Sequence, residues 1–238
     1  MAAAPGSAGQ DAGRTALVPG SDGPELTLRV IAGTAKGRTL RSPRTRDTRP
    51  ITDRAKESLF SILGPRIPGS SFLDLFAGTG GVGIEALSRG AAHAAFVERA
   101  ASALADIRHN LGATHLAANA EVIAADVFTY LRGDPAPFDV IFVAPPQWRG
   151  LWTRTVQLLD QRPGWLAPDG VAVVQHDPSE STDVPLQHLR ISSERTYGRV
   201  RFTFFRPVGD RAGDASPEVS GSGRPGVPGR RRRDSRTG

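Results

Sequence analysis

The sequence contains no cysteine, which excludes disulfide bonds, thiolate catalysis and metal sites with cysteine ligands. Its five histidines show no paired spacing such as His-x-x-x-His, so we expect them in packing or at the surface and expect no metal site. No hydrophobic run approaches the length that crosses a bilayer. The first 23 residues lack the basic segment and hydrophobic core of a secretion signal. The sequence therefore predicts a cytoplasmic protein that acts without a membrane or a metal.

The composition predicts one globular domain, which we expect to be a monomer. The chain has 238 residues, of which 39% are hydrophobic, and a formal net charge of +6, which favours a polyanionic partner. We expect a disordered arm at residues 1–24, a basic hairpin and helix at 25–64, the main domain at 65–208 and a disordered tail at 209–238. The arginine run Arg230–Arg233 either adds non-specific RNA affinity or is a solvated tail.

The segment that organises the sequence is a hydrophobic run followed by a cluster of glycines. Residues 72–75 are of strand type, and residues 78–83 then read GTGGVG ahead of a helical pattern. Glycine can adopt φ > 0 and lets a ligand approach the main chain, while the start of a helix offers unpaired N–H groups. The spacing predicts a nucleotide-binding turn, with a tight turn that holds no ligand as the alternative.

Three carboxylates are placed to meet a ligand at this turn. Asp74 lies inside the hydrophobic run, where a carboxylate needs hydrogen-bond partners or a functional reason. Glu98 ends a second such run, 20 positions after Gly78, and is placed to accept hydrogen bonds from ribose hydroxyls. Asp126 ends a third run and could meet an adenine amino group.

Strand-like and helix-like patterns alternate along the rest of the chain. Further strands are expected at residues 94–97, 119–125, 138–143, 171–175, 189–194 and 199–206, and helices at 100–111 and 151–159. Another helix should be capped by Thr52 or Asp53 and end at Gly64-Pro65, and a short one should begin beyond Asp126. The alternation predicts an α/β fold with a parallel sheet, helices on both faces and a ligand at the carboxyl ends of the strands. Phe202, Phe204 and Phe205 are expected in the core.

Several of these motifs resemble class I methyltransferases that use S-adenosyl-L-methionine (SAM). They are DLFAGTG at residues 74–80, Glu98, Asp126 and the strand end APPQW at residues 144–148. The resemblance implies a Rossmann-like class I methyltransferase sheet, mostly parallel with an antiparallel C-terminal hairpin, preceded by a small N-terminal β-hairpin and helix.

An upstream block narrows the resemblance. Residues 49–54 read RPITDR and residues 57–60 read ESLF, which is similar to the RsmD family. That family methylates the N2 amine of a guanine in small-subunit (16S) rRNA. The similarity covers about residues 28–206 and implies 16S rRNA or the assembling small ribosomal subunit as the partner.

The motifs, the resemblance and the basic stretch together give three sets of candidate site residues. The cofactor-binding set is Asp74, Phe76, Gly78, Thr79, Gly80, Glu98, Asp126, Val127 and Thr52. The RNA-binding set is Arg29, Lys36, Arg38, Arg49 and Arg54. The catalytic set is Pro145, Pro146, Gln147 and Trp148.

The basic residues ahead of the glycine turn have two interpretations. Residues 26–40 predict a hairpin of two short strands, and the positive charge continues to Lys56. The fixed fork of donors in arginine suits RNA phosphates, which we favour over a merely solvated face. The resemblance makes Arg49, Thr52 and Asp53 candidates for contacts near the methionine end of the cofactor, with helix capping and a surface ion pair as the alternative.

The chain departs from the family pattern at Ala144, where the family has Asp or Asn before the two prolines and an aromatic residue after them. A guanine amine is a poor nucleophile, so a side chain that accepts its hydrogen bond should lower the barrier, and alanine cannot do so. The Pro145 carbonyl and the Gln147 amide remain as acceptors, with Trp148 as a stacking surface for an extruded base.

Three functions therefore stay open. The first is a working rRNA methyltransferase, and the second is a catalytically weakened or inactive assembly factor that binds SAM and RNA. The third is a nicotinamide-dependent dehydrogenase, which the Pro145-Pro146 strand end and the basic N-terminal block fit poorly.

Overall fold

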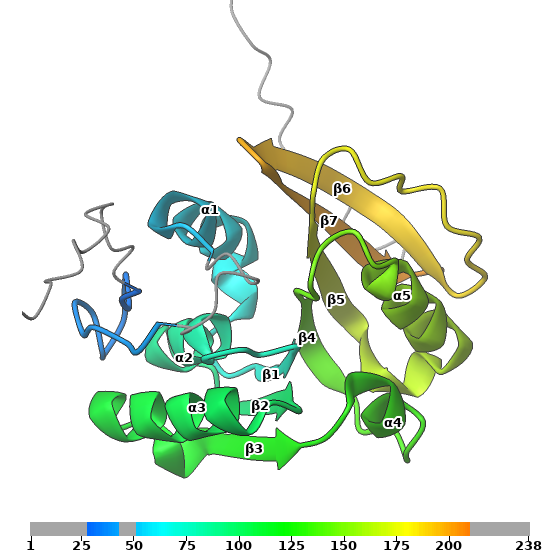
Figure 1. Cartoon of the computed structure of the whole chain (residues 1–238). Coiled ribbons are helices and arrows are strands. Elements are labelled where there is room, and N and C mark those ends of the chain that lie inside the picture. Colours follow the sequence, from blue (N-terminus) through cyan, green and yellow to red (C-terminus); the bar gives the residue numbers. More distant parts are fainter. Residues whose placement is uncertain (1–27, 43–50, 210–238) are drawn as a thin grey trace, which may run out of the picture. The chain divides into compact units, whose positions relative to one another are not determined.

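The computed structural model describes residues 28–42 and 51–209. The expected arm at 1–24, Arg49 and the run Arg230–Arg233 lie outside these residues. The described part contains a seven-stranded sheet of order β3-β2-β1-β4-β5-β7-β6 (Figure 1). Its strands are β1 (Ser71–Leu75), β2 (His93–Glu98), β3 (Ala120–Ala124), β4 (Phe138–Val143), β5 (Leu166–His176), β6 (Leu189–Tyr197) and β7 (Val200–Pro207).

The pairing of the strands confirms a mostly parallel sheet with an antiparallel C-terminal hairpin. β1 pairs in parallel with β2 and β4, β2 with β3, and β4 with β5, whereas β7 runs antiparallel to both β5 and β6. The order along the sheet changes direction between β1 and β4, because the chain proceeds outward from β1 and then returns to its other side. Such a switch point leaves a crevice at the carboxyl ends of the strands, where ligands bind in open α/β sheets.

Helices cover both faces of the sheet. They are α1 (Asp53–Leu63), α2 (Gly81–Ser88), α3 (Ala101–Thr114), α4 (Val127–Leu131) and α5 (Leu151–Gln161), with short 3₁₀ turns at Gly64–Arg66, Ala117–Asn119 and Pro163–Trp165. One hydrophobic cluster joins α1, α2 and α3 to the sheet, and a second joins α4 and α5 to its other face. Successive strand residues alternate between them: Phe202 and Phe204 belong to the first cluster and Phe205 to the second, so their core packing is confirmed. None of the described helices is both long and apolar enough for a membrane span.

The N-terminal hairpin is less regular than expected. Within the N-terminal loop (residues 28–42), the two arms share a single antiparallel bridge, Arg29 with Thr39, and form no regular strand. The reason is that helix α2 supplies acceptors for the loop's N–H groups. Glu85 accepts from Ile31 (2.8 Å) and Ala32 (3.0 Å), so these groups are not available to a partner strand.

Lys56 corrects another expectation, because it does not belong to the exposed basic stretch. Its side chain is fully buried, and its Nζ lies 3.2 Å from Glu85 Oε2 and donates to the Arg29 carbonyl. Burial lowers the pKa of Lys56, and the Glu85 carboxylate opposes that shift. The lysine therefore joins α1, α2 and the N-terminal loop from inside the fold.

Candidate active site

A tight backbone bend connects β1 to α2. Phe76 (φ 61°), Gly78 (φ 55°) and Gly80 (φ 80°) all have left-handed backbones, and α2 starts directly after Gly80. A Cβ added to Gly78 would meet no atom within 4 Å, so the main chain is open to a ligand there. Phe76 is not a glycine, and residues held in such conformations cluster at functional sites. The bend therefore has the open main chain that the sequence motif predicts.

Not every glycine of the motif serves a ligand. A Cβ on Gly83 would lie 2.4 Å from Phe96 Cε1, which means that Gly83 is required for α2 to pack closely against β2. The Gly83 N–H also donates to Asp74 Oδ2 at 2.9 Å. The second half of the motif is thus explained by packing between helix and sheet.

Asp74 lies beneath the bend rather than at its surface. Its side chain is buried, and burial raises its pKa to about 8 although the hydrogen bond from Gly83 opposes this shift. The negative charge of Glu98 adds a smaller increase. Asp74 therefore fixes the start of α2, and its direct contact with a cofactor stays a prediction.

Glu98 reaches the bend from the tip of β2. Its Oε2 accepts from Gly78 N at 3.0 Å, and its Oε1 accepts from the main-chain N–H groups of Arg99 (2.8 Å) and Ala100 (2.9 Å). A carboxylate has about four lone-pair positions, so further acceptor capacity remains for ribose hydroxyls. The structure brings this acid against the glycine bend, as the spacing of 20 residues indicates.

Asp126 follows β3 and is the N-cap residue of α4. Its Oδ1 accepts from Phe128 N (3.0 Å) and Thr129 N (3.2 Å), while its Oδ2 lies 3.9 Å from Arg99 Nη1. The preceding Ala125 N donates to the Glu98 carbonyl at 3.0 Å, so the two acidic tips are neighbours. Val127 is buried directly after Asp126. The helix-capping role of Asp126 was not foreseen from the sequence.

The strand end with the two prolines lies beside the bend. Ala144 N donates to the Leu75 carbonyl at 3.3 Å, which joins the tips of β4 and β1. Pro145 is buried and Pro146 is half-buried, whereas Trp148 is 64% exposed with φ 63°. Among the described residues, none hydrogen-bonds to the half-buried amide of Gln147, so its oxygen is available as an acceptor.

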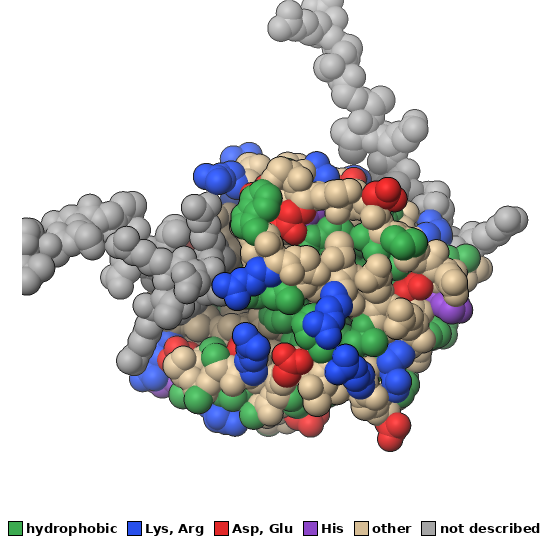
Figure 2. All heavy atoms as spheres, turned by 45° about the vertical axis from the view of Figure 1, so that its right-hand side comes forward, with side chains coloured by type: hydrophobic (Ala, Val, Ile, Leu, Met, Phe, Trp, Pro, Cys, Tyr) green, Lys and Arg blue, Asp and Glu red, His purple; other side chains and the backbone are tan. Residues whose placement is uncertain are grey.

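The described members of the RNA-binding set lie on the N-terminal loop and on α1. Arg29 Nε pairs with Asp53 at 2.7 Å, and Arg38 Nη1 donates to the Ala113 carbonyl at 2.8 Å. Lys36 and Arg54 are exposed. Thr52 Oγ1 accepts from Ala55 N at 3.3 Å and caps α1, so the capping interpretation and the Arg29–Asp53 ion pair are both observed. Figure 2 shows one face of the molecule, on which hydrophobic side chains lie in the middle with separate Lys and Arg side chains among and around them.

Comparison with known proteins identifies the family. A family model described as "Conserved hypothetical protein 95" matches residues 28–206. The Escherichia coli (strain K12) protein named ribosomal RNA small subunit methyltransferase D is 34% identical over 188 residues, which cover 79% of this chain and 94% of that protein. The chain belongs to the RsmD family.

Solved structures agree with this membership. The structure of the Escherichia coli protein yhhF superimposes with a TM-score of 0.68 at 34% identity, covering 76% of this chain and 98% of that one. The more distant SMU.776, solved in complex with SAH, shares the fold with a TM-score of 0.53 at 19% identity, over 67% of this chain and 50% of that one. The RsmD resemblance and the class I fold are thereby confirmed.

One residue that supports the bend in this RsmD-family chain was missed from the sequence. Asn110 of α3 is fully buried, and its Nδ2 donates to the Thr79 carbonyl at 3.0 Å. Its Oδ1 accepts from Arg41 N at 2.8 Å, which ties the N-terminal loop to the same helix. The available signal was a polar side chain on the hydrophobic face of a helix, where it must find partners.

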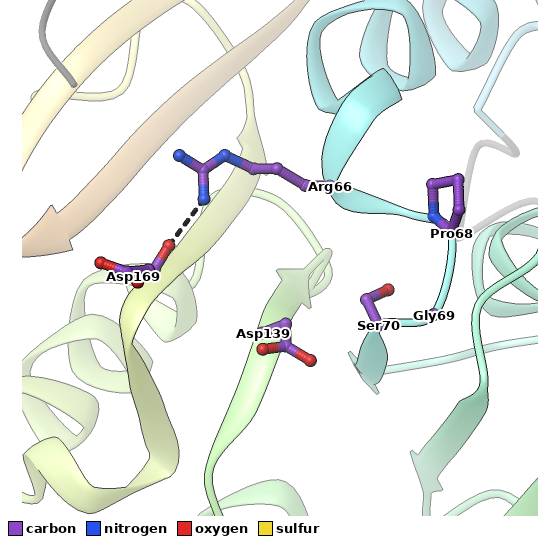
Figure 3. Close-up of a pocket in the computed structure, with 6 residues that line it drawn as sticks. All are labelled: Arg66, Pro68, Gly69, Ser70, Asp139 and Asp169. Atoms are coloured by element: carbon purple, nitrogen blue, oxygen red, sulfur yellow. Dashed lines mark hydrogen bonds between the residues drawn. The ribbon is translucent and has the colours of Figure 1, made fainter.

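An open pocket at the other end of the sheet is not part of this site. It is lined by Arg66, Pro68, Gly69, Ser70, Asp139 and Asp169 (Figure 3). Arg66 Nη1 donates to the Asp169 carbonyl at 2.7 Å, and Asp139 Oδ2 accepts from both the main-chain N–H and the hydroxyl of Ser71 at 2.8 Å. The pocket lies at the amino ends of β1 and β4, and Arg66, Ser70 and Asp139 each use polar atoms for hydrogen bonds within the protein.

Proposed function

We propose that this RsmD-family protein transfers a methyl group from SAM to the N2 amine of a guanine in small-subunit (16S) rRNA. The observation that carries the proposal is the junction of the two strand tips. The glycine bend, with Glu98 bonded to Gly78, lies directly beside the Ala144-Pro145 strand end through the hydrogen bond from Ala144 N to the Leu75 carbonyl. A nucleoside cofactor and a target base would thus meet at one edge of the sheet.

The residues at the bend fit the adenosyl part of SAM. The main chain at Gly78 is open to a ligand, and Glu98 has acceptor capacity left for the ribose hydroxyls. Asp126, whose Oδ2 lies 3.9 Å from Arg99 Nη1, is proposed to accept from the adenine amino group. When bound, SAM supplies an electrophilic methyl group on a sulfonium. Thr52, which caps α1, is proposed to approach the methionine part.

The strand end holds the target amine. Gln147 has an acceptor oxygen without a partner among the described residues, and the Pro145 carbonyl is a second acceptor, so the alanine at position 144 does not remove every acceptor. Accepting an N–H hydrogen bond from the guanine amine makes its lone pair more available to the methyl group. Alignment of the two reactants provides the rest of the rate enhancement.

The RNA contacts come from the basic side chains around the N-terminal loop. Lys36 and Arg54 have no carboxylate partner among the described residues, and Arg29 and Arg38 have donors left beyond their single contacts. We infer that these four and Arg49 bind phosphates, which position a structured RNA without reading its sequence. The protein is proposed to act as a monomer in the cytoplasm, on the assembling small subunit.

A methyl-transfer assay tests the proposal. Purified protein is incubated with labelled SAM and small ribosomal subunits that lack the modification, and the label is mapped by nuclease digestion and mass spectrometry. We expect one N2-methylguanine in 16S rRNA, and the Glu98→Ala variant serves as the control for cofactor dependence. Label on another base or atom would refute the guanine-N2 assignment, and no label on any RNA would support the inactive assembly factor, which the names of the relatives do not favour.

A further inference from the structure

Trp148 is a large aromatic side chain that the protein leaves uncovered. It lies between β4 and α5, it is 64% exposed, and its backbone has a left-handed φ of 63°. Gly150, two positions later, is also left-handed with φ 60°. Two left-handed residues so close together leave the segment without the repeating hydrogen bonds of a helix or a strand. A contact other than a regular backbone hydrogen-bond pattern must therefore fix the conformation of Trp148.

The two ends of this segment are held by regular structure. On one side, Ala144 N donates to the Leu75 carbonyl, and on the other the Gly150 carbonyl accepts from Arg154 N at 3.2 Å and from Thr153 Oγ1 at 2.7 Å. The middle, residues 146–149, has a single hydrogen bond to the described part of the chain. It is the bond from Trp148 N to Glu180 Oε1 at 3.4 Å.

Glu180 is well placed to serve as an anchor. It belongs to the segment after β5, and its Oε2 accepts from the indole N–H of Trp152 at 2.6 Å. Trp152 is buried in α5, and its ring stacks on His176 with centroids 4.7 Å apart. His176 is buried in turn, and its Nε2 lies 2.9 Å from Thr203 Oγ1 in β7. One carboxylate thus connects the middle of the segment to buried side chains of α5, β5 and β7.

We propose that Glu180 is a positioning residue that holds Trp148 ready to stack on the extruded guanine. This inference rests on the proposed function, in which Trp148 is the stacking surface. Without the carboxylate, residues 146–149 would sample several conformations, and RNA binding would have to order them again. The removal of Glu180 should therefore weaken RNA binding and raise the KM for RNA. It should leave kcat nearly unchanged, because Glu180 contacts neither the cofactor-binding bend nor, in this role, the reacting amine.

The charge of Glu180 makes the test sharper. Removing a carboxylate near a polyanion by itself strengthens RNA binding, so a rise in KM would have to come from the lost anchor. Asp183 lies in the same segment, is exposed, and its carboxylate has no hydrogen bond or ion pair among the described residues. Asp183→Ala is therefore the matched control, because it removes the same charge and leaves the anchor intact.

The experiment compares steady-state methylation of 16S rRNA particles by the wild type, Glu180→Ala, Glu180→Gln, Trp148→Ala and Asp183→Ala, with SAM affinity measured by calorimetry as the check on folding. We expect Glu180→Ala to raise the KM for RNA about tenfold, in the range of one lost base–aromatic stack, with kcat within about twofold and SAM affinity unchanged. Glu180→Gln keeps one acceptor oxygen and should restore part of the loss. Adding Glu180→Ala to Trp148→Ala should raise the KM for RNA little further, because both substitutions remove the same stacking contact with the base.

Two results would overturn the inference. One is an unchanged KM in both Glu180 variants while Trp148→Ala raises it. The other is a fall in kcat at constant KM in Glu180→Gln, which would place the carboxylate on the amine itself. If the wild type methylates no RNA, the proposed function fails, and the anchor is then judged from fluorescence anisotropy. The contribution of Trp148 is obtained by subtracting the fluorescence of a Trp148→Phe counterpart of each protein. Its anisotropy should decay faster in Glu180→Ala than in the wild type, and equal anisotropy decay would refute the anchor.

Discussion

Replacing Glu85 by glutamine should strongly destabilise the protein. The two carboxylate oxygens of Glu85 each face two donors: Oε1 accepts from Ala32 N and Arg89 Nε, and Oε2 from Ile31 N and Lys56 Nζ. In Glu85→Gln one of these oxygens becomes an NH₂ group, so two donors would face a third. The buried Lys56 also loses its counter-ion. Breaking a buried ion pair from one side costs about 3–5 kcal/mol.

Urea denaturation measures this effect as a loss of unfolding free energy. For a domain whose total stability is of the order of 5–15 kcal/mol, such a loss is large. Glu57→Gln on the exposed side of α1 is the control, and it should change the stability by less than about 0.5 kcal/mol. Adding Lys56→Met to Glu85→Gln should recover part of the loss, because it removes the buried cation that lacks a counter-ion.

The pH dependence gives a second check on the same reasoning. The folded-state pKa of Lys56 is lowered from its ordinary value of 10.5 by burial, so the unfolded chain binds more protons and this lysine favours folding more as pH rises towards 10.5. In Glu85→Gln the carboxylate no longer opposes that shift, so the pKa of Lys56 falls further. The deficit in unfolding free energy of the variant relative to the wild type should therefore shrink between pH 7 and pH 9.5. A deficit below about 1 kcal/mol at pH 7, or one that grows with pH, would refute the buried pair as the reason.

Three further predictions concern the bend. The pKa of Asp74 is raised to about 8 from 3.8, so between these values the folded state binds more protons than the unfolded chain, and the stability should fall as pH rises. Asp74→Asn should remove this pH dependence, which is measured as denaturation midpoints from pH 4 to pH 8. Gly83→Ala should cost about 1–3 kcal/mol because its Cβ would lie 2.4 Å from Phe96, and a cost well below 1 kcal/mol in urea denaturation would contradict the packing argument. Gly78→Ala meets no atom and should cost about 1–2 kcal/mol from its left-handed backbone alone. Glu98→Gln should weaken SAM binding about tenfold by calorimetry, and an unchanged affinity would exclude a ribose contact.

Local patterns predicted most of the fold correctly. The hydrophobic run 138–143, for example, corresponds to strand β4 with the same limits, because a strand covered on both faces must be hydrophobic at almost every position. The β6 and β7 hairpin was also expected, although β6 extends to Tyr197. Strand and helix periods are short-range properties, so the residues that decide them are adjacent in the chain.

The charged residues were harder to assign, because their local patterns do not show their partners. Lys56 and Arg54 are two positions apart on α1, yet one is buried against Glu85 and the other is exposed. Glu180 and Asp183 lie in one polar segment, and only Glu180 reaches Trp148 and Trp152. In each case the difference depends on a contact with a residue 28 or more positions away.

By itself, the sequence determined the α/β alternation, the glycine bend and the acids at the strand tips, because strand ends, turns and spacing are written in consecutive residues. Tertiary structure alone decided which carboxylates lie at the open edge of the sheet and which are buried inside the protein. Asp74 and Glu98 look alike as strand acids, but Asp74 is buried under α2 while Glu98 meets Gly78 at the edge. That distinction depends on how α2 packs against the sheet, and close packing between distant residues is not encoded in any short stretch of the chain.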